Sequence, residues 1–241
     1  MALALRFAVI PLAFTLAFAS RQDATYDLVW RPKTGDTMGY KLKVDIDSTP
    51  DKFTFTANIK NQVVKVKPNG DYDVETATKE AHVVHGSHDD PVPDDNKPTV
   101  DTYNSHGQKI STSEDNDPSE ESNAGFNTLD AVTDQLSPKD PIGIGGTWSA
   151  IIKANPKQRR EAARVNYKLV GKEKQGTYQT LKIEFSYKET EKDNPVVSDG
   201  YILVSLDDFS LVRFEATIKG AKFSDDPEFP NGDATLSVIR D

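Results

Sequence analysis

The chain has 241 residues, 36% of them hydrophobic, and its 29 basic and 38 acidic side chains give a formal net charge of −9. The absence of cysteine excludes a disulfide framework, a thiol nucleophile and cysteine-ligated zinc or haem sites. The acidic balance argues against nucleic acid as a partner, because nucleic-acid phosphates would repel the chain. The length suits one large all-β domain or two small ones, and the lack of a strong internal repeat favours a single β-rich domain over residues 20–241.

Residues 1–19 have the organisation of a secretory signal peptide. A basic residue precedes an apolar run over 7–18, and Ala17 and Ala19 place small residues at the two positions that a signal peptidase reads. This run is shorter than the roughly 20 residues needed to span a bilayer. Ser20 stands where a bacterial lipoprotein would need cysteine. We therefore expect an exported, soluble protein of the periplasm or extracellular space, not membrane-spanning after signal cleavage.

Cleavage is predicted to follow Ala19, because the pattern of small residues and the short apolar run both place the cut there. Intact-mass measurement of the secreted protein checks this prediction. A mature mass that still includes residues 7–18 would contradict it.

Most of the mature chain alternates apolar and polar residues. Leu42, Val44 and Ile46, for example, alternate with charged residues. Such alternation is typical of antiparallel strands with one buried and one solvated face. We expect a strand that begins at Trp148 and further strands near 25–31, 37–47, 52–67, 72–84, 162–173, 177–190, 200–206, 210–223 and 234–239.

The expected strands are unusually long, and long strands in one antiparallel sheet must twist and coil. Between Ile59 and Val66 the apolar residues change from odd to even positions, which predicts a β-bulge that bends the sheet. The fold class expected is therefore mainly β, with one long-stranded, strongly curved antiparallel sheet in the form of a half-barrel.

Two segments break this pattern with polar sequence. Residues 85–100 and 111–125 are rich in aspartate, glutamate, serine, asparagine and proline and contain few apolar residues. Such segments cannot bury enough apolar surface to offset the entropy lost on ordering. We predict acidic mobile loops at both places.

Between the two groups of strands, apolar residues follow a helical spacing. Phe126, Leu129 and Val132 recur every three residues, and Pro138 ends the pattern. This predicts a short amphipathic helix near 126–137, with its apolar side packed on the concave side of the sheet.

The Gly-Gly-Thr-Trp sequence at 145–148 opens a strand after the expected helix, and an apolar strand at 200–206 turns at acidic residues and returns through 212. In this order of elements the chain resembles secreted bacterial proteins of unknown function and the lipoprotein-carrier fold of the LolA/LolB type. The resemblance covers roughly residues 25–240. It implies a half-barrel whose concave face, partly plugged by helices, holds acyl chains.

Large side chains dominate the face that is expected to point inward. These side chains are bulky enough to fill the hollow of a half-barrel without a ligand. Only one helix is expected to cover the hollow. We therefore expect weak binding of an apolar molecule rather than a dedicated carrier. The candidate apolar-ligand face comprises Phe53, Phe55, Ala57, Phe126, Leu129, Val132, Phe185, Tyr187 and Phe214.

These observations predict an exported, non-catalytic binding or interaction module of the bacterial envelope that weakly holds an apolar small molecule or lipid on the concave face. An alternative is a structural envelope protein with a self-filled core, whose loops meet a protein partner. The sequence shows no legible nucleophile–base pair, so we predict that the protein is not an enzyme and needs no cofactor.

A second alternative is a metal-binding protein. His82, His85 and His88 recur every third residue, and imidazole is a good ligand for Zn²⁺, Cu²⁺ or Ni²⁺. On a strand, however, His82 and His85 point to opposite faces. These residues are weak candidates, and no metal site is predicted.

Overall fold

The computed structural model describes residues 24–48, 51–93, 98–113, 129, 131–134, 136–155, 160–191, 193–221 and 232–241. The predicted signal peptide, Phe126 and most of the predicted loop at 111–125 lie outside the described residues.

Nearly all of the secondary structure is β. The strands are β1 (Thr25–Tyr26), β2 (Thr37–Ser48), β3 (Asp51–Val66), β4 (Tyr72–His85), β5 (His88–Val92), β6 (Thr99–Tyr103), β7 (Lys109–Thr112), β8 (Ile142–Gly143), β9 (Thr147–Ile152), β10 (Ala163–Gln175), β11 (Tyr178–Glu189), β12 (Val197–Ser205), β13 (Leu211–Ala221) and β14 (Gly232–Arg240).

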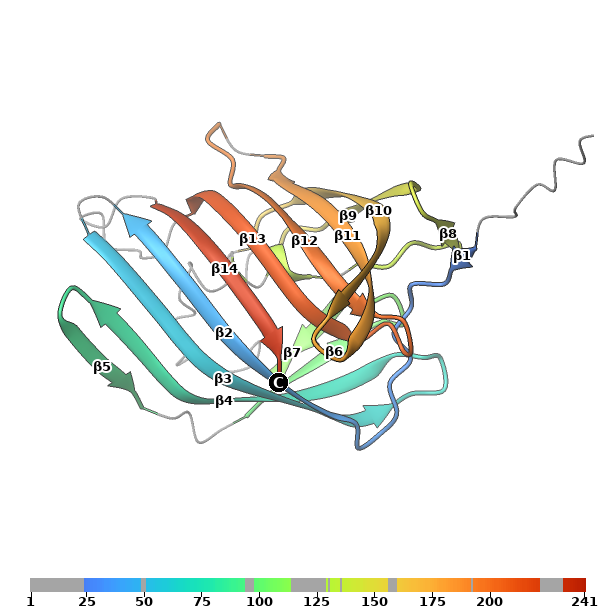
Figure 1. Ribbon diagram of the computed structural model, residues 1–241, viewed down its shortest axis with the longest axis horizontal. Coiled ribbons are helices and arrows are strands. Elements are labelled where there is room, and N and C mark those ends of the chain that lie inside the picture. The colour runs from blue at the N-terminus through green and yellow to red at the C-terminus, as the bar shows by residue number, and fades with distance from the viewer. Residues whose placement is uncertain are drawn as a thin grey trace, which may run out of the picture.

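Twelve of the strands form one antiparallel sheet in the order β7-β6-β4-β3-β2-β14-β13-β12-β11-β10-β9, with β5 paired to β4 (Figure 1). Its two end strands, β7 and β9, do not pair with each other within the described part of the chain, so the sheet is open. The prediction of one large, long-stranded antiparallel sheet is confirmed. The central strand β14 pairs with β2, which places the last strand of the chain beside its first long strand.

Irregular pairings allow this long sheet to curve. The register between β3 and β4 shifts once between Thr56 and Asn58 and again between Val63 and Lys65. The second shift lies within the segment for which the change in apolar pattern predicts a bulge. A bulge adds a residue to one strand, which bends that strand and increases its local twist.

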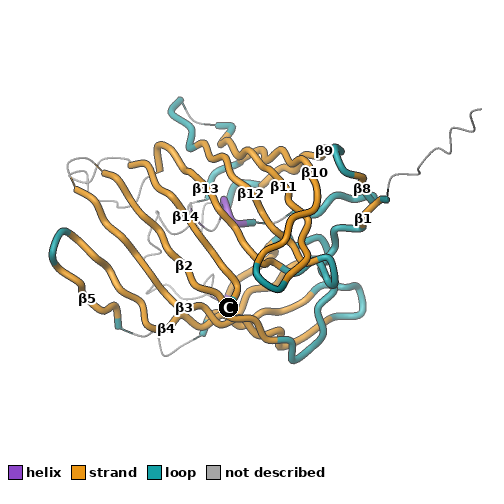
Figure 2. Tube along the Cα trace, in the orientation of Figure 1, coloured by secondary structure: helices purple, strands orange, loops and turns teal. Residues whose placement is uncertain are grey.

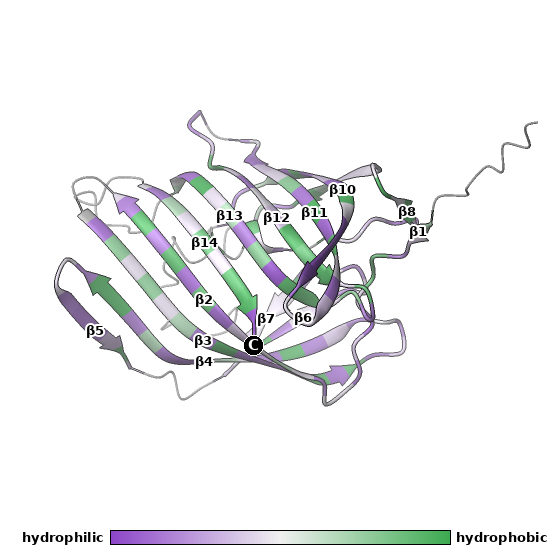
Figure 3. Cartoon of the chain, in the orientation of Figure 1, coloured by the Kyte–Doolittle hydropathy of each residue, from purple (hydrophilic) through white to green (hydrophobic). Residues whose placement is uncertain are grey.

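Apolar and polar residues alternate along the strands, as the stripes in Figure 3 show, and this gives the sheet one solvent-exposed face and one buried face. In β11, for example, Ile183, Phe185 and Tyr187 are buried and Glu184 is exposed. The buried face of β9–β14 and β2 forms the main core, whereas a smaller core gathers around Val63, Tyr72 and Val74.

One helical segment lies against the main core. Leu129 and residues 131–133 are helical, and the segment lies behind the sheet in Figure 2. Leu129 and Val132 are 8% and 3% exposed and belong to the main core. The helix predicted near 126–137 is therefore present in its described middle, but it ends before Asp134.

Two predictions about the first half of the chain are wrong in part. The strand predicted over 25–31 is only β1, because a hydrogen bond of 2.7 Å from the amide of Val29 to the carbonyl of Asp27 turns the chain there. The loop predicted over 85–100 contains β5 and the start of β6. All five residues of β5 are exposed, so the strand shows no apolar alternation, and backbone pairing with β4 forms it instead.

Candidate functional site

The cross-strand register places the described candidate residues for apolar-ligand binding on one face of the sheet. We call this the concave face, because it contacts the helical residues of the main core. One row of directly paired residues crosses eight neighbouring strand pairs from β9 to β4 on this face. It consists of Trp148, Tyr167, Phe185, Gly200, Ala216, Leu236, Val44, Phe55 and Val83. Tyr187 and Phe53 lie in the next row on one side, and Phe214 and Ala57 in the next row on the other.

Glycine at position 200 lets the aromatic rings of the concave face pack closely. A Cβ atom there would lie 2.9 Å from Cε1 of Phe185 and 2.0 Å from the carbonyl oxygen of Glu215. The ring of Phe185 therefore occupies the space over Gly200, where its centroid lies 5.2 Å from that of Phe214.

Burial on the concave face differs between the two halves of the sheet. Phe185, Tyr187 and Phe214 are 5%, 2% and 1% exposed, so the chain itself fills the face over β11–β13. On the same face over β2–β4, Val44 and Ala57 are buried, but six other apolar side chains are only half-buried. We call these the apolar strip; they are Leu42, Ile46, Phe53, Phe55, Ile59 and Val83.

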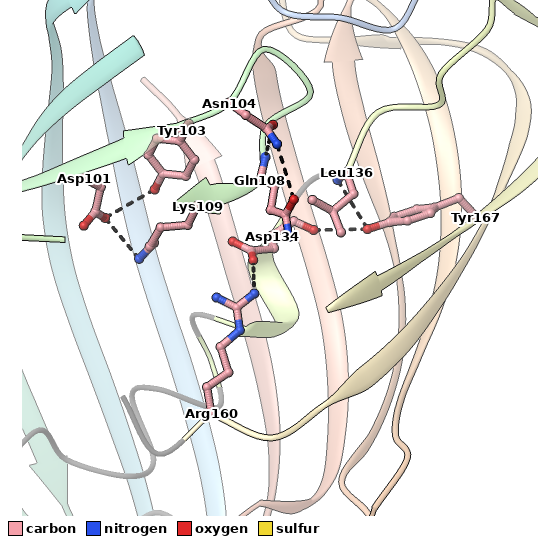
Figure 4. Close-up of polar contacts among 9 residues, drawn as sticks. All are labelled: Asp101, Tyr103, Asn104, Gln108, Lys109, Asp134, Leu136, Arg160 and Tyr167. Atoms are coloured by element: carbon pink, nitrogen blue, oxygen red, sulfur yellow. Dashed lines mark hydrogen bonds and ion pairs between the residues drawn. The ribbon is translucent and has the colours of Figure 1, made fainter. Parts of the chain in front are cut away.

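Charged side chains are buried on segments outside the apolar strip, among them β6, β7 and the end of β11. The carboxylate of Asp134 pairs with the guanidinium of Arg160, with side chains 4% and 7% exposed. Asp101 pairs with Lys109 at 3.0 Å, with side chains 10% and 9% exposed. Glu189 is 4% exposed and accepts a hydrogen bond of 2.9 Å from the amide of Val196. We call these five charged residues the buried polar cluster, and Figure 4 shows its two ion pairs.

Tyrosines connect the two ion pairs to the sheet. The hydroxyl of Tyr167 donates to the carbonyl oxygen of Asp134 at 3.1 Å (Figure 4). The hydroxyl of Tyr103 donates to Oδ2 of Asp101 at 3.3 Å, and its ring stacks on that of Tyr72 at 5.6 Å. Burial raises the pKa of Tyr72 well above its ordinary value, and the negative charge of Asp134 raises this pKa further.

Burial likewise raises the pKa of Tyr167 and Tyr187. The stability that these protonated tyrosines contribute is fully present below about pH 10, the pKa of an unfolded tyrosine, and it falls as the pH rises from there toward the raised folded values. We therefore expect the free energy of unfolding to decrease above about pH 10. Circular dichroism and tyrosinate absorbance, recorded together during an alkaline titration, check this. Tyr72→Phe is expected to make the decrease shallower, and full ionisation of the tyrosines before any loss of structure would contradict the prediction.

Four polar side-chain atoms in the described part of the structure are buried without a hydrogen-bond partner. They are Oδ1 of Asp101, Nδ1 of His106, Nε of Arg160 and Oγ of Ser198. Two of them belong to the buried polar cluster. Buried polar atoms normally have a hydrogen-bond partner, so these four atoms are candidates for hydrogen bonds to a bound water or ligand.

The structure does not bring the three candidate histidines together. Nδ1 of His82 lies 2.9 Å from Oδ1 of Asp89. His85 stacks on Phe53, with ring centroids 4.4 Å apart, and pairs with His88 across the β4–β5 hairpin. Because side chains alternate between faces, this register puts His82 on the face opposite His85. Within the described residues, no group of three or more metal-binding side chains is suitably placed for a metal ion.

Sequence reasoning did not identify the buried polar cluster. Glu189 carried a signal, because it continues the inward series of Ile183, Phe185 and Tyr187 with a charged residue. Asp134 and Arg160 carried none, since neither falls at an apolar position of a periodic segment.

No protein-family model and no curated protein matches the chain. A solved structure of a DUF1329 family protein from Desulfovibrio piger matches over 86% of this chain and 85% of its own, at 11% sequence identity and a TM-score of 0.24. The resemblance to LolA/LolB-type carriers stays a prediction. In the described residues, no helix is both long and apolar enough to cross a membrane.

Proposed function

We propose that the protein is an exported binding module that holds an apolar molecule on the apolar strip of its concave face. The observation that carries this proposal is the difference in burial along one continuous face. Side chains of the main core fill the face over β11–β13, whereas Phe53, Phe55 and Ile59 remain half-buried over β3. Solvent-facing aromatic and branched side chains on a concave surface are the usual lining of a site for an apolar ligand.

The arrangement favours weak binding. Tight small-molecule sites enclose most of the ligand surface. Here the fully buried aromatic residues occupy one half of the face, so a ligand would contact the strip mainly from one side. The affinity expected is therefore low, in keeping with a module that accepts and releases its ligand.

An interaction with a protein partner is the second candidate, and the sheet edge at β9 favours it. Within the described residues β9 pairs only with β10, and Ile151 of β9 and the nearby Ile144 are 52% and 50% exposed. An uncharged edge strand with exposed apolar side chains can accept a strand from another protein.

Binding to the strip can be tested with the uncharged fluorophore N-phenyl-1-naphthylamine. Ile59 projects from the concave face, and the neighbouring Lys60 is exposed on the opposite face. Ile59→Gln is expected to weaken binding by about fivefold, the effect of losing about 1 kcal/mol of apolar contact. Lys60→Gln is the matched control and should leave binding unchanged.

Native mass spectrometry of the protein purified from its host provides a second measurement. A co-purified apolar molecule that is lost in Ile59→Gln would support the proposal. Absence of any fluorophore binding, or equal effects of the two variants, would favour the protein-partner function instead.

A further inference from the structure

Strand β9 forms one edge of the large sheet, and part of its backbone points away from the sheet. Leu169 of β10 exchanges backbone hydrogen bonds of 2.7 and 3.0 Å with residues 145–146, just before β9. In an antiparallel pair, residues that bond to the neighbouring strand alternate with residues whose backbone groups point outward. No second strand in the described residues pairs with β9. The residues whose N–H and C=O groups point outward are all exposed; they are Thr147, Ser149 and Ile151.

This edge lacks the features that usually protect a sheet against further pairing. Edge strands are commonly blocked by charged side chains or by proline, which has no N–H to donate. Within the described residues β5 pairs only with β4, and it carries both protections in Asp89, Asp90 and Pro91. The six residues of β9 include no charge and no proline, and Ile151 is 52% exposed. The edge at β9 is therefore open to a further strand.

Positive charge lies beside this edge on the face opposite the concave face. Ile151 pairs with Arg164 of β10, which in turn pairs with Lys188 of β11. Both cations are exposed, and in the described part of the chain neither forms an ion pair. Lys168 adds a third cation, opposite Glu184. Like charges directly opposite each other destabilise a sheet, so an anionic group bound nearby would relieve the repulsion between Arg164 and Lys188.

The two faces restrict the side chains of a segment added to β9. On the charged face its residues would lie two strand spacings from β10, about 10 Å, which the side chains of Arg164 and a glutamate can bridge together. On the concave face its residues would lie beside Trp148 and Ala150, which are half-buried and pack against the main core. A segment in which acidic and apolar residues alternate matches both faces, because side chains of a strand alternate between faces.

We propose that β9 accepts an extended segment of a partner protein as an additional strand, and that acidic residues alternate with apolar ones in this segment. Backbone hydrogen bonds to the outward groups of β9 hold the segment, and its carboxylates compensate the charges of Arg164 and Lys188. This inference rests on the second candidate function, because it assigns the chemistry of that protein partner. It does not depend on the apolar strip.

The test is the fluorescence anisotropy of two short fluorescein-labelled peptides, in which valine alternates with glutamate or with lysine. The glutamate peptide is expected to bind about tenfold more tightly than the lysine peptide. Ser149→Pro is expected to weaken binding of the glutamate peptide about tenfold, because it removes an outward N–H and its ring obstructs the added strand. The fold should tolerate this proline, since the amide it replaces faces solvent. Ser149→Ala keeps the amide and is the matched control.

Arg164→Glu tests the charge and leaves the backbone of β9 unchanged. It is expected to weaken binding of the glutamate peptide about fivefold, the effect of losing an exposed ion pair worth about 1 kcal/mol. Lys60→Glu reverses an exposed charge on the same face of β3 and should have no effect. If circular dichroism shows that Ser149→Pro does not fold, Arg164→Glu with its control decides alone.

Equal binding of the two peptides, or unchanged binding in a folded Ser149→Pro variant, would overturn the inference. So would sedimentation showing a dimer that Ser149→Pro dissociates, because a second copy of the chain would then cover the edge. Binding of N-phenyl-1-naphthylamine to the apolar strip should be the same in Ser149→Pro as in the unaltered protein, so the outcome at β9 and the outcome at the strip are read separately.

Discussion

Replacing Arg160 with methionine is expected to lower the free energy of unfolding by about 3–5 kcal/mol, because it leaves the carboxylate of Asp134 buried without its cation. The side chain of Asp134 is 4% exposed, so water cannot readily take the place of the guanidinium. Urea denaturation followed by circular dichroism measures this change.

The double variant Arg160→Met with Asp134→Leu separates the two contributions. Removing both charges eliminates the unpaired carboxylate, so the double variant should be more stable than Arg160→Met alone. A loss below about 1 kcal/mol in Arg160→Met would show that the pair behaves like an exposed one. The ion pair would then hold the end of the helical segment in place without contributing much stability.

Replacing Phe214 with alanine is expected to cost about 3–5 kcal/mol, because its side chain is fully buried and its removal leaves a cavity in the main core. Phe214 is 1% exposed and lies next to Phe185 on the concave face. The same urea titration measures the change, and a calorimetric scan should show a lower melting temperature.

Thr217→Ala is the matched control on the same strand, since Thr217 is exposed on the opposite face. Its expected effect is within about 0.5 kcal/mol. If the two variants lost similar amounts of unfolding free energy, the concave face of β13 would not be the better packed one. That result would contradict the description of this part of the concave face as filled.

The sequence predicted the long strands well, because alternation directly reflects a sheet with one buried face. Strands predicted over 72–84 and 162–173 are observed at Tyr72–His85 and Ala163–Gln175. The bulge expected between Ile59 and Val66 is present as a register shift between Val63 and Lys65. Each of these features depends on residues that are close together in the chain.

Features that depend on distant residues could not be predicted in this way. Strand β5 has no apolar alternation and forms only because β4 offers it hydrogen-bonding partners. Asp134 and Arg160 come together from segments 26 residues apart. Which half of the concave face would be filled also depended on the curvature of the whole sheet, and no single strand specifies it.

The pairing of β14 with β2 has a consequence for how the protein acquires its structure. In the large sheet, β2–β7 can pair among themselves, as can β9–β13, and within the described residues the two groups join through β14. Until that strand is synthesised, the inner edges of β2 and β13 have no neighbour. Such a contact between the two ends of the chain is slow to form, because the intervening chain must be ordered first. The sheet therefore cannot be completed until β14 has been synthesised, which keeps its two halves apart on the nascent chain until then.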